Sequence, residues 1–472
     1  MNLNSIVLKK WGNFNLVINV KRFILSLDQK KIIYFSLVIS FLYILIYNLF
    51  HFDPILGYDA EAHYSYVDTF SRYLPYKVYI PRNFETREFF NPPIAYIFPS
   101  VVQVFCRNLI ESSNLLKECQ PIYGKLTQIF QAIIYCISIF INLKTINLIL
   151  NKKNYINFSY FILTMLLAVN YKTISMLRGE VYILFFLSIL IHLLFRMEKK
   201  EFNFKLIDIA FFGSIIGLLA LSRQWAFLLF PAFFILTFRN PKKFRKKYLY
   251  FIFGSFVTGF FLSGWFYINN FLIYGTFTPF NTEKVGLKLD NLTFFDWNSV
   301  STYLFENPIR PYFKNQFFPI LYSDLWGDYW GYFVFTSRFL DIGRDQLSIG
   351  EYLGRVNFIS LFTSGLLIYG IFFQICNFKK PLVTSYILYS ILISLSGFLW
   401  FTLAYPTSGS GDTIKATYLV QVFNLCTFVT SLFMEEIKNK KVYYFLLSIL
   451  ISIFIYNFDS YLSHFPINYP AY

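Results

Sequence analysis

The chain has 472 residues, of which 56% are hydrophobic and only 14% are charged, and its mean hydropathy is +0.48. This composition excludes a disordered chain or an ordinary soluble domain, and it predicts an all-α polytopic membrane protein. The formal net charge is +16. Since the Lys and Arg residues lie in short runs between apolar segments, the pattern that orients membrane helices, we expect no nucleic-acid partner.

The N-terminal region predicts a basic tail followed by a membrane anchor. Residues 1–31 are basic and weakly amphipathic, as in a cytoplasmic tail that lies on the membrane surface. Residues 32–50 are the first apolar segment. The sequence HFDPILGYD that follows lacks the small-residue cleavage site of a signal peptide, so we expect this segment to stay as an anchor.

The rest of the chain predicts ten further spans, so about eleven in total. If every basic run between them is cytoplasmic, the N-terminus lies inside and the C-terminus outside. The inner side, with the inner ends of the spans included, then holds 24 Lys and Arg against 6 acidic residues, and the outer side holds 18 against 20. The ten segments are 125–149, 155–170, 180–196, 206–221, 223–238, 248–273, 356–376, 381–404, 415–434 and 441–457.

This scheme divides the chain into two membrane modules, 32–273 and 356–472, joined by a long outer loop at 274–355. Residues 92–110 are also apolar, but a full crossing there would place every later basic run outside. We therefore expect a juxtamembrane or re-entrant helix, begun by Pro92 and Pro93, within a large first outer loop at 51–124. The five cysteines show no metal-ligand spacing, and Cys106 and Cys119 in this loop either form a disulfide or remain free thiols.

The start of the first outer loop carries a cluster of titratable residues just past the membrane exit. Carboxylates are costly near lipid, so Asp59, Glu61 and His63 are candidates for a functional site. Asp59 could act as a general base toward an acceptor hydroxyl or amide, or it could cap a helix in a solvated acidic loop. Glu61 would face elsewhere on a helix. His63 lies one helical turn beyond Asp59 and could bind a metal or a phosphate, or it could be a hydrogen-bonded structural residue.

Four cations at predicted outer ends of spans are candidates for binding a phosphate. Arg178 and Arg223 each begin a span, where an unpaired charge costs roughly 2–3 kcal/mol. A lipid phosphate is one natural partner, and an intramembrane salt bridge or a snorkelling side chain is the alternative. Lys284 and Lys415 are weaker candidates, although Lys415 lies at a predicted helix start, where backbone N–H groups attract anions.

The long outer loop holds a further acidic and aromatic stretch. Asp324 and Asp328 would be one turn apart on a helix and could bind a divalent cation, although two carboxylates alone do not specify one. Trp326 between them belongs either to an interfacial aromatic belt or to a sugar platform.

Three features, in this order and placement, resemble the GT-C class of membrane glycosyltransferases. They are YDAEAHYSYV, FNPPIAYIFP, in which Asn91 stands where that class has a His, and the outer pair LYSDLWGDYWGYF and GDTIKATYL. The resemblance implies a catalytic Asp at Asp59 and a donor phosphate held by Arg178, Arg223, Lys284 and Lys415. It also implies an inverting transfer of sugar from a polyprenyl-phosphate donor to a lipid, polysaccharide or protein acceptor. The enzyme would lie in a bacterial inner membrane with its active site on the periplasmic side.

Two other classes remain open. A flippase for lipid-linked sugars should carry charges at mid-membrane, whereas the predicted spans are nearly free of charge except at their outer ends. An O-antigen-type polymerase or ligase has its large outer loop later in the chain, and the acidic first loop would then be unexplained.

Overall fold

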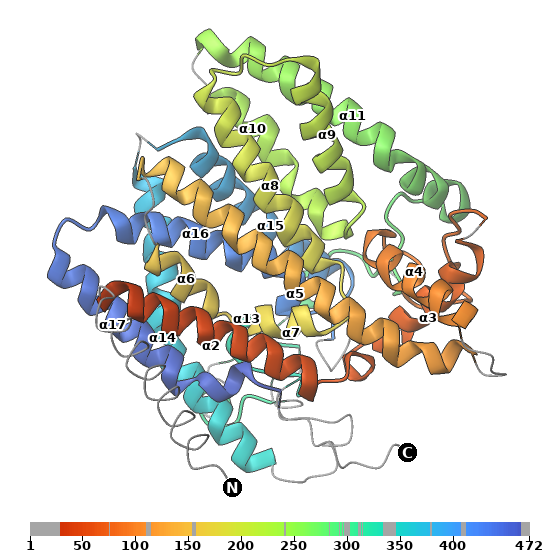
Figure 1. Ribbon diagram of the computed structural model, residues 1–472, viewed down its shortest axis with the longest axis horizontal. Coiled ribbons are helices and arrows are strands. Elements are labelled where there is room, and N and C mark those ends of the chain that lie inside the picture. Colours follow the sequence, from red (N-terminus) through yellow and green to blue (C-terminus); the bar gives the residue numbers. More distant parts are fainter. Residues whose placement is uncertain are drawn as a thin grey trace, which may run out of the picture. The chain divides into compact units, whose positions relative to one another are not determined.

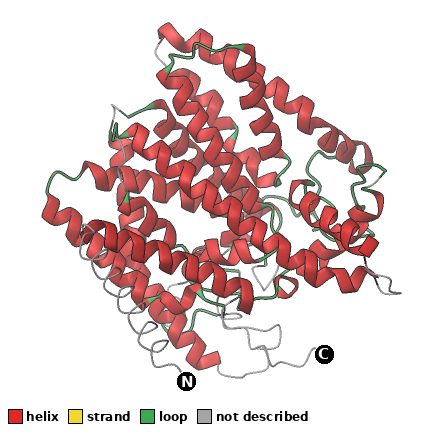
Figure 2. Ribbon diagram, viewed as in Figure 1, coloured by secondary structure: helices red, strands yellow, loops and turns green. Residues whose placement is uncertain are grey.

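A computed structural model gives the arrangement of the chain (Figures 1 and 2). Residues 1–46 and 47–472 form two separate units, and the predicted basic tail up to residue 28 lies outside the described residues. In the part described, all regular structure is helical apart from one isolated β-bridge between Thr293 and Gln316. The described residues are 29–74, 76–109, 115–152, 157–239, 242–282, 284–291, 293, 294, 296, 303–309, 313, 315–333, 346–377, 380–406 and 412–463.

Seven described helices are long and apolar enough to cross a membrane. Their length and composition are consistent with the predicted helical membrane protein, but the predicted count of about eleven spans is not confirmed. The seven are α2 (Gln29–His51), α5 (Leu115–Ile149), α8 (Glu180–Lys199), α11 (Lys242–Tyr274), α14 (Gln346–Cys376), α15 (Leu382–Ala404), and η6 (Ala416–Leu419) continued by α16 (Val420–Glu436).

The other four predicted spans are helical but shorter or broken. They correspond to α6 (Phe158–Met165) with α7 (Ala168–Ser175), α9 (Leu206–Ala220), η2 (Gln224–Leu229) with α10 (Pro231–Arg239), and α17 (Lys440–Tyr456). Within residues 47–472, contacts define the direction in which two of these segments run relative to a neighbouring long helix.

The broken segment α6–α7 runs antiparallel to α16 along its full length. Residue numbers rise along one partner as they fall along the other, in the side-chain pairs Ser159–Glu435 (3.2 Å), Thr164–Thr427 (3.4 Å), Asn170–Asn424 (2.8 Å) and Thr173–Thr417 (2.9 Å). Side chains satisfy carbonyl groups that the break releases. Asn170 donates to the carbonyl oxygen of Thr164 at 3.3 Å, and the Tyr171 hydroxyl donates to that of Met165 at 3.0 Å. Such compensation is what allows a helix to break in apolar surroundings.

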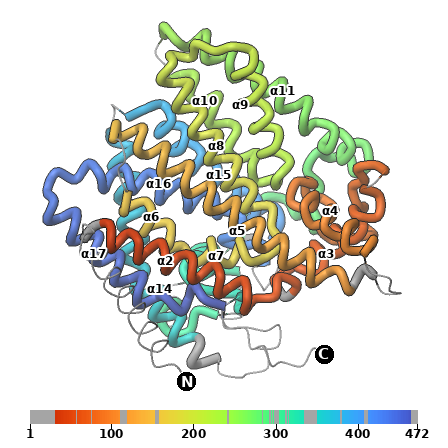
Figure 3. Tube along the Cα trace, viewed as in Figure 1, coloured from red at the N-terminus to blue at the C-terminus, as the bar shows by residue number. Residues whose placement is uncertain are grey.

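Helices α9 and α11 run parallel and approach closely through small residues (Figure 3). A Cβ atom placed on Gly217 would lie 2.9 Å from the carbonyl oxygen of Gly259, and one placed on Gly259 would lie 3.0 Å from that of Gly213. Small residues spaced by four let two backbones meet, which is a common way of joining helices in lipid. Since α9 and α11 are parallel, the intervening η2–α10 segment returns in the opposite direction.

The region predicted as the first outer loop contains η1 (Pro54–Leu56), α3 (Ala60–Tyr73) and α4 (Ile94–Leu109), so the predicted helix after Pro92-Pro93 is confirmed as a helix. The carboxylate of Asp68 in α3 is buried and accepts hydrogen bonds from Gln103 of α4 (2.9 Å) and from Gln120 and Tyr123 of α5 (2.7 and 3.2 Å). Burial among these neutral donors raises the pKa of Asp68 above its ordinary value.

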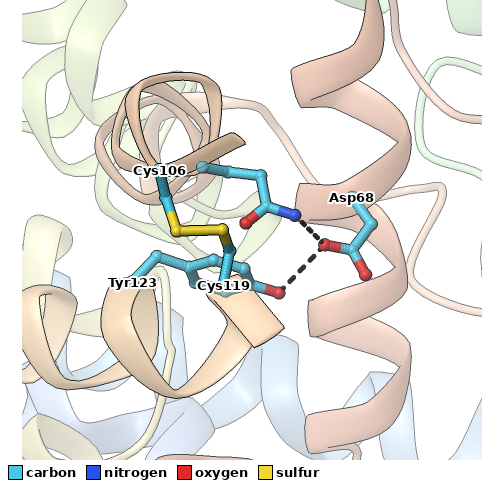
Figure 4. The surroundings of a disulfide bond; sticks show 5 residues. Asp68, Cys106, Cys119 and Tyr123 are labelled. Carbon is cyan, nitrogen blue, oxygen red and sulfur yellow. Dashed lines mark hydrogen bonds between the residues drawn. A yellow bond between two sulfur atoms is a disulfide. The ribbon is translucent and has the colours of Figure 1, made fainter. Parts of the chain in front are cut away.

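A disulfide joins the same helices. Cys106 of α4 and Cys119 of α5 are bonded, with their Cα atoms 5.9 Å apart (Figure 4). Of the two alternatives that the sequence left open, the structure therefore has the disulfide. The disulfide fixes α4 to the start of α5. Because Asp68 of α3 is hydrogen-bonded to both of these helices, the disulfide also helps to hold α3, the helix that follows Asp59.

Thiol counting tests this bond. In denaturant without reductant, a maleimide should label the three free cysteines, Cys136, Cys376 and Cys426, and after reduction it should label all five. Replacing Cys106 and Cys119 by Ser should lower the free energy of unfolding by about 3 kcal/mol, the loop-closure value for a loop of this order. Replacing the exposed Cys376 by Ser is the matched control, and equal stability of the two variants would contradict a structural role.

Candidate functional site

Asp59 is held in an unusual backbone conformation at the start of α3. Its φ is +60°, in the left-handed region, which costs a residue with a Cβ roughly 1–2 kcal/mol and is often found at functional sites. Although Asp59 occupies the N-cap position, its side chain makes no capping hydrogen bond. The carboxylate is therefore not used to begin the helix, contrary to the alternative that made Asp59 a helix cap.

The carboxylate of Asp59 instead pairs with two buried cations. Its Oδ2 atom lies 2.7 Å from Nζ of Lys415 and 4.0 Å from Nη2 of Arg178. The cationic side chains are 8% and 1% exposed, whereas the Asp59 side chain is 32% exposed. The ring of Tyr58 lies against both cations, 4.7 Å from Lys415 Nζ and 4.5 Å from Arg178 Cζ. Asp59 is thus the accessible member of this cluster, which we call the Asp59 cluster (Tyr58, Asp59, Arg178 and Lys415).

The charge of Lys415, and then that of Arg178, holds the pKa of Asp59 well below its ordinary value of 3.8 against the opposing effect of burial. With these partners Asp59 is an ionised carboxylate and a weak base. The proton affinity of Asp59 would rise if Lys415 and Arg178 moved away from its carboxylate.

Buried hydrogen bonds fix the turns that carry the two cations. Gln131 of α5 accepts from the backbone N–H of Arg178 at 3.1 Å and donates to the carbonyl oxygens of Ile174 and Met176 at 2.7 and 2.5 Å. Asp324, at the end of α13 (Phe317–Trp326), accepts from the N–H of Ala416, the residue after Lys415, at 2.7 Å. The other oxygen of Asp324 pairs with the buried Lys172 of α7.

Arg178 keeps hydrogen-bonding capacity that the described protein groups do not use. Its Nη2 donates to the carbonyl oxygen of Tyr58 at 2.5 Å, but Nε and Nη1 are buried and have no hydrogen-bond partner. Buried hydrogen-bond donors nearly always have a partner, so two buried donors without one indicate a site for a ligand or water. Two guanidinium N–H groups beside an ammonium group favour an anion such as a phosphate.

Arg223 belongs to a neighbouring network in which two carboxylates already balance it. Its Nε lies 3.0 Å from Glu180 and its Nη1 3.5 Å from Glu88, and all three side chains are buried. Asn91 donates to Glu88, and Asn91 also donates to the Tyr96 hydroxyl at 3.1 Å. Of the alternatives that the sequence left open for Arg223, the structure therefore has a buried salt bridge.

His63 is buried within the same network. Its Nδ1 shares a hydrogen bond of 2.6 Å with the Tyr96 hydroxyl, and its Nε2 lies 3.9 Å from Glu88. Burial, together with the charges of Arg178 and Arg223, lowers the pKa of His63 well below its ordinary value. A neutral imidazole offers a phosphate no charge. The described residues contain no group of three or more His, Cys, Asp or Glu placed to hold a metal.

The remaining predicted residues lie apart from the Asp59 cluster or have structural partners. Lys284 lies 5.4 Å from the ring of Trp400. Asp328 falls after the end of α13, not one helical turn from Asp324, and accepts from the N–H of Phe333 at 2.7 Å. Trp326 is buried and donates to Ser364 at 3.0 Å, so its ring offers no exposed sugar platform. Glu61 is exposed on α3.

Sequence reasoning missed four members of these networks: Tyr58, Glu88, Lys172 and Gln131. A lysine inside the apolar run before Arg178 was a signal for Lys172, because such a charge needs a partner. For Glu88 and Gln131 the sequence carried no comparable signal, since the cation that pairs with Glu88 and the backbone groups that bond to Gln131 are more than forty residues away.

The length and composition of the described helices are those of a helical membrane protein. In comparisons with known proteins no family model matches the chain, and no curated protein or solved structure matches it either.

The acid dependence of stability tests the pKa of Asp59. Because its folded pKa is lowered, the stabilisation from its charge is fully present above the ordinary value of 3.8 and is lost only as the pH falls further. The difference in melting temperature between the wild type and Asp59→Asn should therefore stay constant from pH 7 to about pH 4. A difference that disappears already between about pH 6 and pH 5 would contradict the pairing with Lys415.

A double-mutant cycle tests the Arg223 network. Glu180→Gln and Arg223→Met should each cost about 3–5 kcal/mol of unfolding free energy, because each leaves a buried charge with fewer partners. The double variant should cost clearly less than the two together, measured by unfolding in detergent. Strictly additive effects would show that the two side chains do not interact.

Proposed function

We propose that this protein is an integral-membrane inverting glycosyltransferase of the GT-C type. It would move a sugar from a polyprenyl-phosphate donor to an acceptor at the outer, periplasmic face of a bacterial inner membrane. The observation that carries the proposal is the Asp59 cluster: an accessible carboxylate beside two buried cations, one of which retains unpartnered N–H groups.

The cations suit the phosphate of a lipid donor. A polyprenyl phosphate cannot leave the bilayer, so its headgroup must be bound close to apolar helices. Arg178 can offer Nε and Nη1 to phosphate oxygens, and Lys415 adds a point charge. Fixed positive charges there would stabilise the negative charge that grows on the phosphate as the sugar leaves.

Asp59 would act as the general base. The acceptor oxygen attacks the anomeric carbon, its proton passes to the Asp59 carboxylate, and the bond to the phosphate oxygen breaks with its electron pair going to the phosphate. In the ligand-free protein Lys415 and Arg178 make Asp59 a weak base. A bound donor phosphate would draw both cations toward itself, raise the proton affinity of Asp59, and so couple activation of the base to donor binding.

The proposed topology has about eleven crossings, with the short and broken helices included. The antiparallel run of α6–α7 along α16 and the parallel pair α9 and α11 support it. The ion pair of Lys152 with Glu435, at 2.8 Å, lies at the end of α16 opposite to Lys415. Basic runs at that end fit a cytoplasmic side, and a disulfide in the first loop fits an oxidising outer side.

The decisive variant is Asp59→Asn. Asn adopts the left-handed conformation more readily than other residues with a side chain, so the fold should persist while the base is lost. Transfer from a labelled lipid-linked sugar in isolated membranes should fall by about 10²–10⁴-fold, the usual contribution of a general base.

Asp53→Asn is the matched control. Asp53 lies on the same segment and accepts a hydrogen bond from the N–H of Ile55 at 3.2 Å, a role that Asn can also fill, so transfer should be kept. Undiminished transfer by Asp59→Asn would overturn the role of Asp59. Movement of the lipid-linked sugar across vesicles with no glycosidic product would favour a flippase instead.

A further inference from the structure

A polar groove lies against the first turns of α3, the helix that follows Asp59, and no residue of the Asp59 cluster lines it. Its volume is about 400 Å³, and it lies between the first turns of α3 and the segment 83–87. Its lining consists of Glu61, Ala62, Ser65, Asn83, Phe84, Glu85, Thr86 and Arg87.

The chain connects one wall of this groove to the Asp59 cluster and the other wall to the Arg223 network. Glu61 is two residues beyond Asp59 in the first turn of α3. On the opposite wall, the Thr86 hydroxyl donates to the carbonyl oxygen of Ala62 at 2.6 Å, and Glu88, two residues on, pairs with Arg223. A molecule in the groove would therefore lie between the segment that follows Asp59 and the segment that leads to Glu88.

The lining has the chemistry of a carbohydrate site. Ser65, Asn83 and Thr86 are neutral hydrogen-bonding residues, and Phe84 is the one aromatic residue of the lining, with 79% of its surface exposed. Hydroxyl groups of a sugar can bind such polar groups while a ring face covers an aromatic side chain.

The charges of the lining narrow the class of ligand. The lining contains two carboxylates, Glu61 and Glu85, and one guanidinium, Arg87. Its net charge is therefore negative, which disfavours an anionic ligand. Glu85 is already fixed by the Tyr79 hydroxyl at 2.9 Å and by the N–H of Arg82 at 2.7 Å, which orders the wall before a ligand arrives. The mostly polar lining is also unsuited to a lipid tail.

We infer that this groove binds the acceptor, and that the acceptor presents a saccharide that is uncharged or carries an amino group. This inference rests on the proposed function, and it supplies the substrate class that the Asp59 cluster alone does not define. Phe84 would hold a sugar face, and Glu61 would bind hydroxyl or amino groups near Asp59.

Binding of the full chain, in detergent, to an array of neutral, amino-substituted and anionic glycans tests the inference. The wild type should bind neutral or amino-substituted glycans, and Phe84→Ala and Glu61→Gln should each weaken binding about three- to tenfold. Tyr76→Ala is the matched control, because Tyr76 is 90% exposed on the same outer loop but does not line the groove. Its binding should equal that of the wild type.

Binding to anionic glycans alone, to no glycan, or equally by Phe84→Ala and Tyr76→Ala would overturn the inference. Binding to a peptide array in place of the glycans would overturn it as well. Thermal unfolding of each variant checks that the fold is intact. The transfer assay separates this result from the proposed function. If transfer needs Asp59 but Phe84→Ala keeps the acceptor KM unchanged, the groove does not bind the acceptor, while the proposed glycosyltransferase activity stands.

Discussion

The ion pair between Asp59 and Lys415 is the interaction on which the site depends. The side chains of Lys415 and Arg178 are buried, and a buried cation without a counter-charge is strongly unfavourable. Asp59 supplies that counter-charge from a left-handed backbone position while remaining one-third exposed. The same pairing holds the two cations in position and keeps the Asp59 carboxylate ionised and weakly basic.

Two irregular turns carry the cations of the Asp59 cluster: the turn that ends in Arg178 and the turn that begins η6. Each of them is held by buried side-chain hydrogen bonds. Gln131 fixes the turn before Arg178, and Asp324 fixes the turn after Lys415. Buried backbone can depart from a helix only when its polar groups are satisfied within the protein. Gln131 and Asp324 satisfy these groups, and so they are positioning residues for the two cations.

Much of this arrangement was predictable from the sequence, and the reasons for the failures are physical. Hydropathy and basic runs predicted the helical class and the positions of the apolar segments, because those depend on local composition. Asp59, Arg178 and Lys415 were identified singly as charges close to lipid. Their pairing was not predictable, since Asp59 and Lys415 are 356 residues apart and only the packed fold brings them together.

The misplaced residues show the same limit. Asp324 and Asp328 were candidates for sharing a divalent cation, but the end of α13 separates them and Lys172 is the partner of Asp324. Trp326 had two open interpretations, an interfacial aromatic belt or a sugar platform, and its burial, which one residue type does not reveal, excludes the exposed platform. Phe84, which is exposed beside the polar groove, gave no such signal in the sequence.

A structure of the full chain with a polyprenyl phosphate bound tests the central claim most directly. The account predicts that the phosphate lies within about 3 Å of Arg178 Nη1 and Lys415 Nζ, and that Lys415 has moved away from the Asp59 carboxylate, leaving it open to an acceptor. A phosphate bound elsewhere, with the Asp59–Lys415 pair unchanged, would contradict it.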